Sequence, residues 1–127
     1  IGASPYGPEL ITGAPDFTLP NWQENATWTV LGGDAIANGA ASNLNGQDAL
    51  VSGVTYHISY TVAAYVEGTH RLFAGSTGAG TGAETGAGSW TFDIVYATDA
   101  GRPGVMIRAA GTSNNFRVTS ISCREVL

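Results

Sequence analysis

The sequence of 127 residues contains no lysine and little charge of either sign. Charged residues make up 12%, and the formal net charge is −5, whereas an ordinary globular domain is roughly 25% charged. The basic residues are five scattered arginines: Arg71, Arg102, Arg108, Arg117 and Arg124. Proteins that bind duplex nucleic acid neutralise its phosphates with clustered basic side chains. We therefore expect no nucleic-acid partner.

Cysteine, helical periodicity and long apolar runs are also scarce. The single cysteine, Cys123, excludes an internal disulfide and occupies an alternating apolar position in "VTSISCREV", so we predict a buried structural thiol. No window keeps the apolar spacing of an amphipathic helix, and no apolar run approaches the length of a membrane span. The sequence thus predicts neither helices nor a membrane partner.

What the sequence does contain is alternation of apolar and polar residues with a period of two. In "VTYHISYTVAAY", residues 54–65, the apolar positions face one way and His57 lies on the other face. The stretches "SWTFDIVY", "GVMIRAA" and "NFRVTSISCREV" repeat the pattern, and the last shifts by one residue, which predicts a bulge near Thr119 or Ser120. Shorter strands are expected at "ELIT", "TWTVLG", "DAIAN", "ALV" and "HRLFAG". Eight or nine short strands separated by turn residues indicate an antiparallel sandwich or barrel.

The most glycine-rich stretch is "FAGSTGAGTGAETGAGSW", residues 73–90, with six glycines. A dinucleotide fingerprint would need a third glycine where Ala83 follows Gly78 and Gly80, and it would need to open a helix. A phosphate-binding P-loop would need a lysine, which the chain lacks. Strong strands on both sides exclude a linker between domains. We interpret the stretch as a strand–turn–strand connection.

Catalytic patterns are missing from the sequence, and we expect no enzyme. The only two histidines, His57 and His70, could approach each other across a hairpin, but a third metal ligand is not evident. Asp93 and Glu67 would form a carboxylate pair only by accident of folding. No serine lies in a nucleophile-elbow motif.

Several segments in order resemble a known family. They are "GPELITGAPDF", "TWTVLGGDAIA", "LVSGVTYHISYTV", "SWTFDIVYAT" and "FRVTSISCREV", and together they run from about Gly7 to Val126. This order is similar to the carbohydrate-binding-module-like (galactose-binding-like) jelly-roll domains of tailed-phage virion proteins. The resemblance implies an all-β, antiparallel jelly-roll β-sandwich of about eight to nine strands. It would occupy residues 9–127, after an extended N-terminal arm at residues 1–8.

In domains of this type a structural calcium ion is often held between an N-terminal turn and an acidic residue of the closing strand. Asp16 and Phe17 match that turn, but Ala14-Pro15 replaces its usual Asn-Gly, and the acidic position falls on Thr119. Calcium prefers several carboxylate ligands. Asp16 is thus the one calcium candidate, and a single matching carboxylate does not make up the ligand set that calcium prefers; no other cofactor is expected.

The resemblance implies a non-enzymatic structural accessory protein on the surface of a tailed-phage virion, as a capsid decoration (cement) protein or a tail-appendage domain. Its partners would be capsid or tail proteins and further copies of itself, with the arm lying along a neighbouring subunit. The alternative is a glycan-binding module for attachment to a host or polysaccharide. Aromatic rings stack on sugars and polar side chains bind hydroxyls, so the candidates are Trp22, His57, Tyr65 and Arg108.

Overall fold

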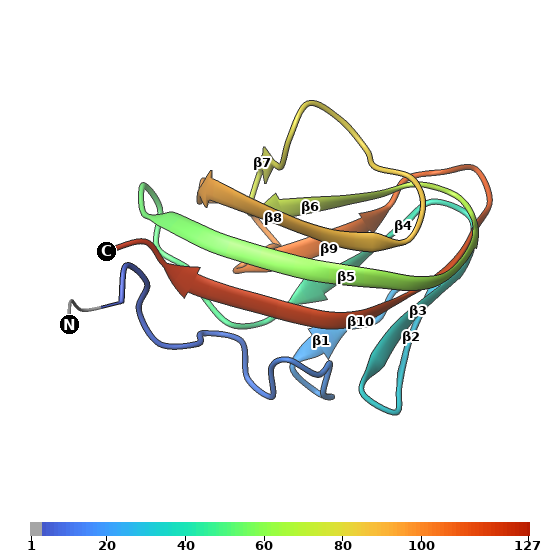
Figure 1. Ribbon diagram of the computed structural model, residues 1–127, viewed down its shortest axis with the longest axis horizontal. Coiled ribbons are helices and arrows are strands. Elements are labelled where there is room, and N and C mark those ends of the chain that lie inside the picture. The colour runs from blue at the N-terminus through green and yellow to red at the C-terminus, as the bar shows by residue number, and fades with distance from the viewer. Residues whose placement is uncertain (1–3) are drawn as a thin grey trace.

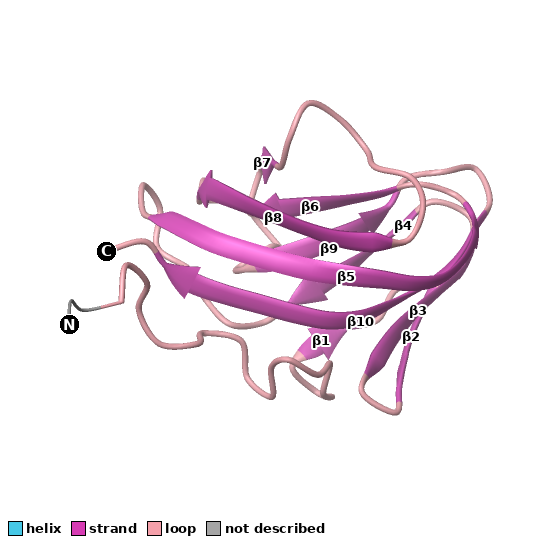
Figure 2. Cartoon of the chain, viewed as in Figure 1, coloured by secondary structure: helices cyan, strands magenta, loops and turns pink. Residues whose placement is uncertain are grey.

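The computed structural model describes residues 4–127, and these form two antiparallel sheets packed face to face (Figures 1 and 2). The strands are β1 (Trp22–Gln23), β2 (Trp28–Leu31), β3 (Asp34–Gly39), β4 (Ser42–Gly46), β5 (Thr55–Glu67), β6 (His70–Ala74), β7 (Thr77–Gly78), β8 (Gly88–Val95), β9 (Val105–Ala109) and β10 (Asn114–Glu125). One sheet has the order β1-β4-β9-β6-β7 and the other β2-β3-β10-β5-β8. Residues 4–127 include no helix that could span a membrane. The predicted all-β sandwich is confirmed.

The core lies between the two sheets, where alternate residues of every long strand point inward. In the first sheet Leu44, Ile107 and Leu72 stand side by side in register on β4, β9 and β6, and all three are fully buried. In the second sheet Ile58 and Tyr60 of β5 face them. Each such side chain contributes about 1.5–3 kcal/mol by leaving water. The alternation seen in the sequence therefore corresponds to real burial.

The predicted bulge in the last strand is confirmed. The register between β10 and β5 shifts between Val118 and Ser120, so that Thr119 is the extra residue. The shift keeps Val118 and, beyond it, Ile121 and Cys123 directed into the core. Cys123 is fully buried, and burial raises the pKa of its thiol to about 12. The prediction of an inert structural thiol is thereby supported.

The sequence misplaced several short strands. The segments "ELIT" and "ALV" are turns and irregular chain, whereas β1, β4 and β7 were not predicted. In β4 only Leu44 faces the core as an apolar side chain, and its neighbours Asn43 and Asn45 are polar. Such a short polar segment becomes a strand through its pairing with β9 and β1, because strand preference depends on neighbouring strands more than on the residues themselves.

The described part of the N-terminal arm lies against the protein's own last strand. The Gly7 amide donates to the Glu125 carbonyl at 2.9 Å, and the Leu10 amide donates to the Cys123 carbonyl at 2.9 Å. The described part of the arm therefore packs on its own domain. Contact of the arm with a neighbouring subunit stays a prediction, and residues 1–3 lie outside the described residues. Glu9 fixes the segment, because its carboxylate accepts hydrogen bonds from Ser122 Oγ at 2.5 Å and the Cys123 amide at 2.8 Å.

Replacing Glu9 with glutamine is expected to lower the free energy of unfolding by about 1–2 kcal/mol, because charge-assisted hydrogen bonds to a backbone amide and a hydroxyl are weakened. Urea unfolding followed by tryptophan fluorescence measures this loss. Glu125→Gln removes the same charge from an exposed side chain that makes no hydrogen bond to the described residues, and it should leave the midpoint unchanged. Equal effects of the two variants would contradict the anchoring role of Glu9.

The glycine-rich stretch 73–90 connects the two sheets, as its interpretation as a strand connection requires. After β6 the chain turns back into the short β7 and then crosses to β8 at the edge of the other sheet (Figure 1). The turn depends on Gly75, which has a φ of 60° and packs so closely that a Cβ would overlap the Ala97 carbonyl oxygen. Only glycine, which has no Cβ, permits both the positive φ and this close approach.

Candidate functional site

Of the two aromatic candidates for sugar binding, Trp22 is buried and Tyr65 is half-buried with its ring and hydroxyl engaged by neighbours. Trp22 is 2% exposed and packs against Phe17, with ring centroids 4.9 Å apart. Tyr65 is half-buried, stacks on Phe116 at 6.4 Å and donates its hydroxyl to the Gly68 carbonyl at 2.6 Å. Both rings are used for packing, and we do not place them in a binding site.

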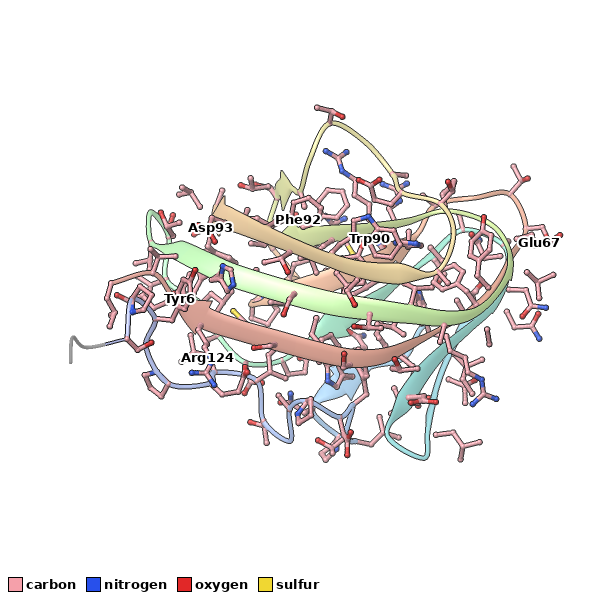
Figure 3. All side chains as sticks on the ribbon, in the orientation of Figure 1. Tyr6, Glu67, Trp90, Phe92, Asp93 and Arg124 are labelled. Carbon is pink, nitrogen blue, oxygen red and sulfur yellow. The ribbon has the colours of Figure 1, made fainter. Side chains whose placement is uncertain are left out.

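The other two candidates, His57 and Arg108, lie on opposite outer faces of the sandwich. Their strands, β5 and β9, belong to different sheets. His57 Nδ1 lies 2.6 Å from Asp93 Oδ1, and the Tyr6 ring stacks on the imidazole at 4.1 Å (Figure 3). His57 is thus occupied by neighbours on one face, while Arg108 is exposed on the other.

The possible metal and carboxylate sites are not assembled. His70 points into the core, away from the outward-facing His57, and Asp93 and Glu67 lie at opposite ends of the molecule (Figure 3). Asp16, the calcium candidate, lies beside Gly33. Residues 4–127 contain no group of three or more His, Cys, Asp or Glu side chains that could hold a metal ion. The candidate site must therefore be sought elsewhere.

A polar surface with one aromatic ring forms on the outer face of β4, β9 and β6. Antiparallel pairing places two rows of side chains next to each other across these three strands. We call this surface the arginine face, and its members are Asn43, Arg108 and Arg71 in one row and Asn45, Met106 and Phe73 in the next. All six alternate with residues that point into the core.

Phe73 is the aromatic ring of the arginine face, and two guanidinium groups hold it. The Arg71 Cζ lies 5.2 Å from the ring centroid and the Arg102 Cζ lies 5.9 Å from it. Both distances are in the range of a cation–π interaction. Arg102 is itself fixed by an ion pair with Asp99 at 3.3 Å. The ring is half-buried, so it is held in place and still partly open to solvent.

Arg71 is oriented by the strand beside it. Its Nε donates to the Ala79 carbonyl at 3.1 Å, and the guanidinium group lies over Gly78, where a Cβ would come within 2.6 Å of Arg71 Cζ. Arg71 pairs directly with Arg108 in the ladder between β6 and β9. Neither arginine forms an ion pair with a carboxylate of the described residues.

The arginine face is an open surface with a partly apolar centre. Met106 belongs to the outer row but is fully buried beneath its neighbours. Beside it, Asn45 Oδ1 is buried without a hydrogen-bond partner among the described residues. No enclosed pocket is found within residues 4–127. A ligand on the arginine face would therefore lie on an open surface.

The sequence contained part of the signal for this site. In "HRLFAG" the alternation that buries His70 and Leu72 places Arg71 and Phe73 on the outer face, and "GVMIRAA" does the same for Met106 and Arg108. The sequence does not show that these two strands are neighbours. The amide side chains of β4 were missed because that strand was not predicted.

Comparisons with known proteins identify structures with the same fold but do not assign the chain to a family. No protein-family model and no curated protein matches the sequence. Two solved mutants of family 29 carbohydrate-binding modules each share 12% identity with this chain, have a TM-score of 0.55 and match over 95% of this chain. The match covers 85% of the first, a mutant of CBM29-2, and 91% of the second. The second N-terminal cellulose-binding domain of Cellulomonas fimi β-1,4-glucanase C shares 18% identity and a TM-score of 0.53, covering 94% of this chain and 95% of its own. These structures share the β-sandwich fold.

Proposed function

We propose that this protein is a non-catalytic glycan-binding module and that the arginine face is its binding surface. The observation that carries the proposal is the Phe73 ring, held by Arg71 and Arg102 next to outward-facing amides on one sheet of a sandwich. The solved proteins that share this sandwich are named as carbohydrate-binding and cellulose-binding modules, which supports the same function.

The chemistry of the arginine face suits a sugar. The face of an aromatic ring packs against the apolar C–H face of a pyranose, as in other aromatic contacts that combine burial with specific geometry. The amide of Asn43 offers a donor and an acceptor, whereas Asn45 can offer only the donor of its amide because its Oδ1 is buried. The guanidinium groups of Arg71 and Arg108 offer donors only. Sugar hydroxyls can serve as both. An open surface of this kind can accommodate one part of a long chain.

The virion role expected from the sequence resemblance remains a prediction that rests on that resemblance. The comparisons give no support to capsid or tail partners or to self-association, and the fold neighbours favour the glycan-binding alternative. The expectation that this chain is not an enzyme stays a prediction. A copy number of zero per purified particle, measured by quantitative mass spectrometry, would remove the virion role.

Replacing Phe73 with alanine is expected to weaken binding to the polysaccharide that binds the wild type best by about tenfold, because loss of stacked aromatic area costs about 1.4 kcal/mol. Affinity gel electrophoresis against neutral and acidic polysaccharides identifies the ligand and measures the loss. Tyr6→Ala removes a ring from the opposite outer face and should leave the affinity unchanged.

The unfolding midpoint of each variant shows that it is folded under the conditions of the binding measurement. Three results would contradict the proposal. One is a wild type that binds none of the polysaccharides. Another is a folded Phe73→Ala protein that binds as tightly as the wild type. The third is a Tyr6→Ala protein that loses affinity to the same extent as Phe73→Ala.

A further inference from the structure

We infer that the arginine face selects an acidic polysaccharide, one that carries carboxylate or sulfate groups, over a neutral one. The inference rests on the proposed function and concerns the class of its ligand. It is carried by the direct pairing of Arg71 with Arg108 across two strands and by the charge around this pair.

Arg71 and Arg108 are paired directly across the ladder between β6 and β9, although the Arg71 guanidinium group extends over Gly78 on the other side of β6. Side chains paired in this way have Cβ atoms only about 5 Å apart, and like charges at these positions are destabilising. In a protein with ten acidic residues and five arginines, neither Arg71 nor Arg108 forms an ion pair with a carboxylate of the described residues. The positive charge of this pair is therefore not neutralised by the chain itself.

Two other arginines, unlike Arg71 and Arg108, have carboxylate partners. Arg102 forms an ion pair with Asp99 at 3.3 Å, and Arg117 forms one with Asp34 at 3.4 Å. On the opposite outer face Asp93 lies against His57. Arg71 and Arg102 lie against Phe73, and Arg108 is the register partner of Arg71 on the same face. Of these three arginines only Arg102 has a carboxylate partner among the described residues, in a protein of net charge −5.

The geometry of Arg71 favours an anion over a hydroxyl group. The Ala79 carbonyl engages only its Nε, so the Nη groups make no hydrogen bond to the described residues. A planar guanidinium group matches a carboxylate or sulfate through paired charge-assisted hydrogen bonds, which are stronger than those to neutral acceptors. An anion bound at either arginine would also neutralise a charge that no carboxylate of the described residues pairs with, a gain that a neutral sugar does not provide.

The test compares one polymer in two forms with the full chain: oligogalacturonate, and the same oligomer with its carboxylates reduced to alcohols. A sulfated dextran and its unsulfated parent form a second pair, which separates carboxylate from sulfate as the source of the anion. Calorimetric titrations at low and at physiological salt use the wild type, Arg71→Gln, Arg108→Gln and Arg124→Gln. Arg124 is on β10 of the opposite sheet and also lacks a carboxylate partner among the described residues (Figure 3), so its variant changes the net charge equally.

We expect the affinity of the wild type for an anionic polymer to be at least about tenfold higher than for its neutral counterpart. This ratio of affinities should be smaller at higher salt, because salt screens the charges. Arg108→Gln and Arg71→Gln should each remove most of that preference, and Arg124→Gln should keep it. Arg108 is exposed and makes no hydrogen bond to the described residues, so its variant remains informative if Arg71→Gln disturbs the contact with Ala79.

Each other outcome overturns the inference in a recognisable way. Equal affinity for the charged and neutral forms of both polymers would overturn the selectivity and leave the proposed function standing. An equal loss in Arg124→Gln would show that binding follows net charge and not the arginine face. Failure of the wild type to bind any polymer would overturn the proposed function together with the inference.

Discussion

Replacing Asn114 with alanine is expected to lower the free energy of unfolding by about 3–4 kcal/mol, the largest single effect we expect outside the apolar core. Asn114 is 1% exposed and makes four hydrogen bonds to backbone groups. Its Oδ1 accepts from the amides of Thr69 and Gly111 at 3.2 and 3.1 Å, and its Nδ2 donates to the carbonyls of Gly39 and Gly111 at 3.1 and 2.9 Å.

The effect is large because one side chain joins three segments. Gly39 ends β3, Thr69 lies in the turn between β5 and β6, and Gly111 lies in the turn before β10. Without the amide, these buried backbone groups lose their partners, and each unsatisfied group costs about 1–3 kcal/mol before the backbone relaxes. The two sheets are connected at this end of the sandwich by the turns that Asn114 fixes.

Asn115→Ala provides the matched control, because it removes the same side chain from the next, exposed residue of β10. Urea unfolding should show a midpoint near that of the wild type for Asn115→Ala and a much lower midpoint for Asn114→Ala. If the two variants differed by less than about 1 kcal/mol, the hydrogen bonds of Asn114 would not organise the turns.

Stability is expected to fall as the pH is lowered from 7 to 5.5, and His70 is the group responsible. His70 is fully buried between Tyr60, Trp90 and Phe116. Its Nε2 lies 3.1 Å from the Gly86 carbonyl, which can only accept, so Nε2 carries the proton and Nδ1 accepts from the Tyr60 hydroxyl at 2.9 Å. Burial lowers the pKa of His70, although the Gly86 carbonyl and the charge of Glu84 act in the opposite direction.

The sign follows from proton binding in the two states. The pKa of His70 is lower in the folded protein than in the unfolded chain, so the unfolded chain binds more protons once the pH is below about 6.5. The contribution of His70 is therefore fully present above that pH and is lost progressively as the pH falls toward the folded-state pKa. One such group can change the free energy of unfolding by at most about 1.4 kcal/mol per pH unit.

Urea unfolding at pH 7.0, 6.0 and 5.5 tests this dependence above the range where most carboxylates titrate. His70→Gln should be less stable at pH 7, because the ring packs against Trp90 and Phe116, and it should show a flatter dependence on pH. His57→Gln, at the other histidine of the chain, should keep the slope of the wild type. If the free energy of unfolding still depended on pH in His70→Gln but not in His57→Gln, the effect would belong to the pair of His57 and Asp93 and not to His70.

The sequence by itself determined which residues of the long strands face the core. The alternation in residues 54–65, the one-residue shift at Thr119 and the apolar position of Cys123 each correspond to burial in the structure. These features were predictable because the two faces of a strand alternate with a period of two, whatever the strand pairs with. The jelly-roll resemblance added the fold, which the sandwich neighbours share.

Only the tertiary structure decided which outer face each polar residue occupies and which residues meet there. Alternation separates inside from outside, but a sandwich has two outer faces, and the choice between them depends on strand pairing over long separations. His57 and Arg108 have similar sequence patterns and lie on opposite faces, whereas Arg71 and Arg108 are 37 positions apart and form a direct pair. Asn43 and Asn45 joined the arginine face because β4 forms by pairing with β9 and β1. Such pairing is set by the packing of the whole core and by turns such as Gly68–Thr69, which send consecutive strands into different sheets.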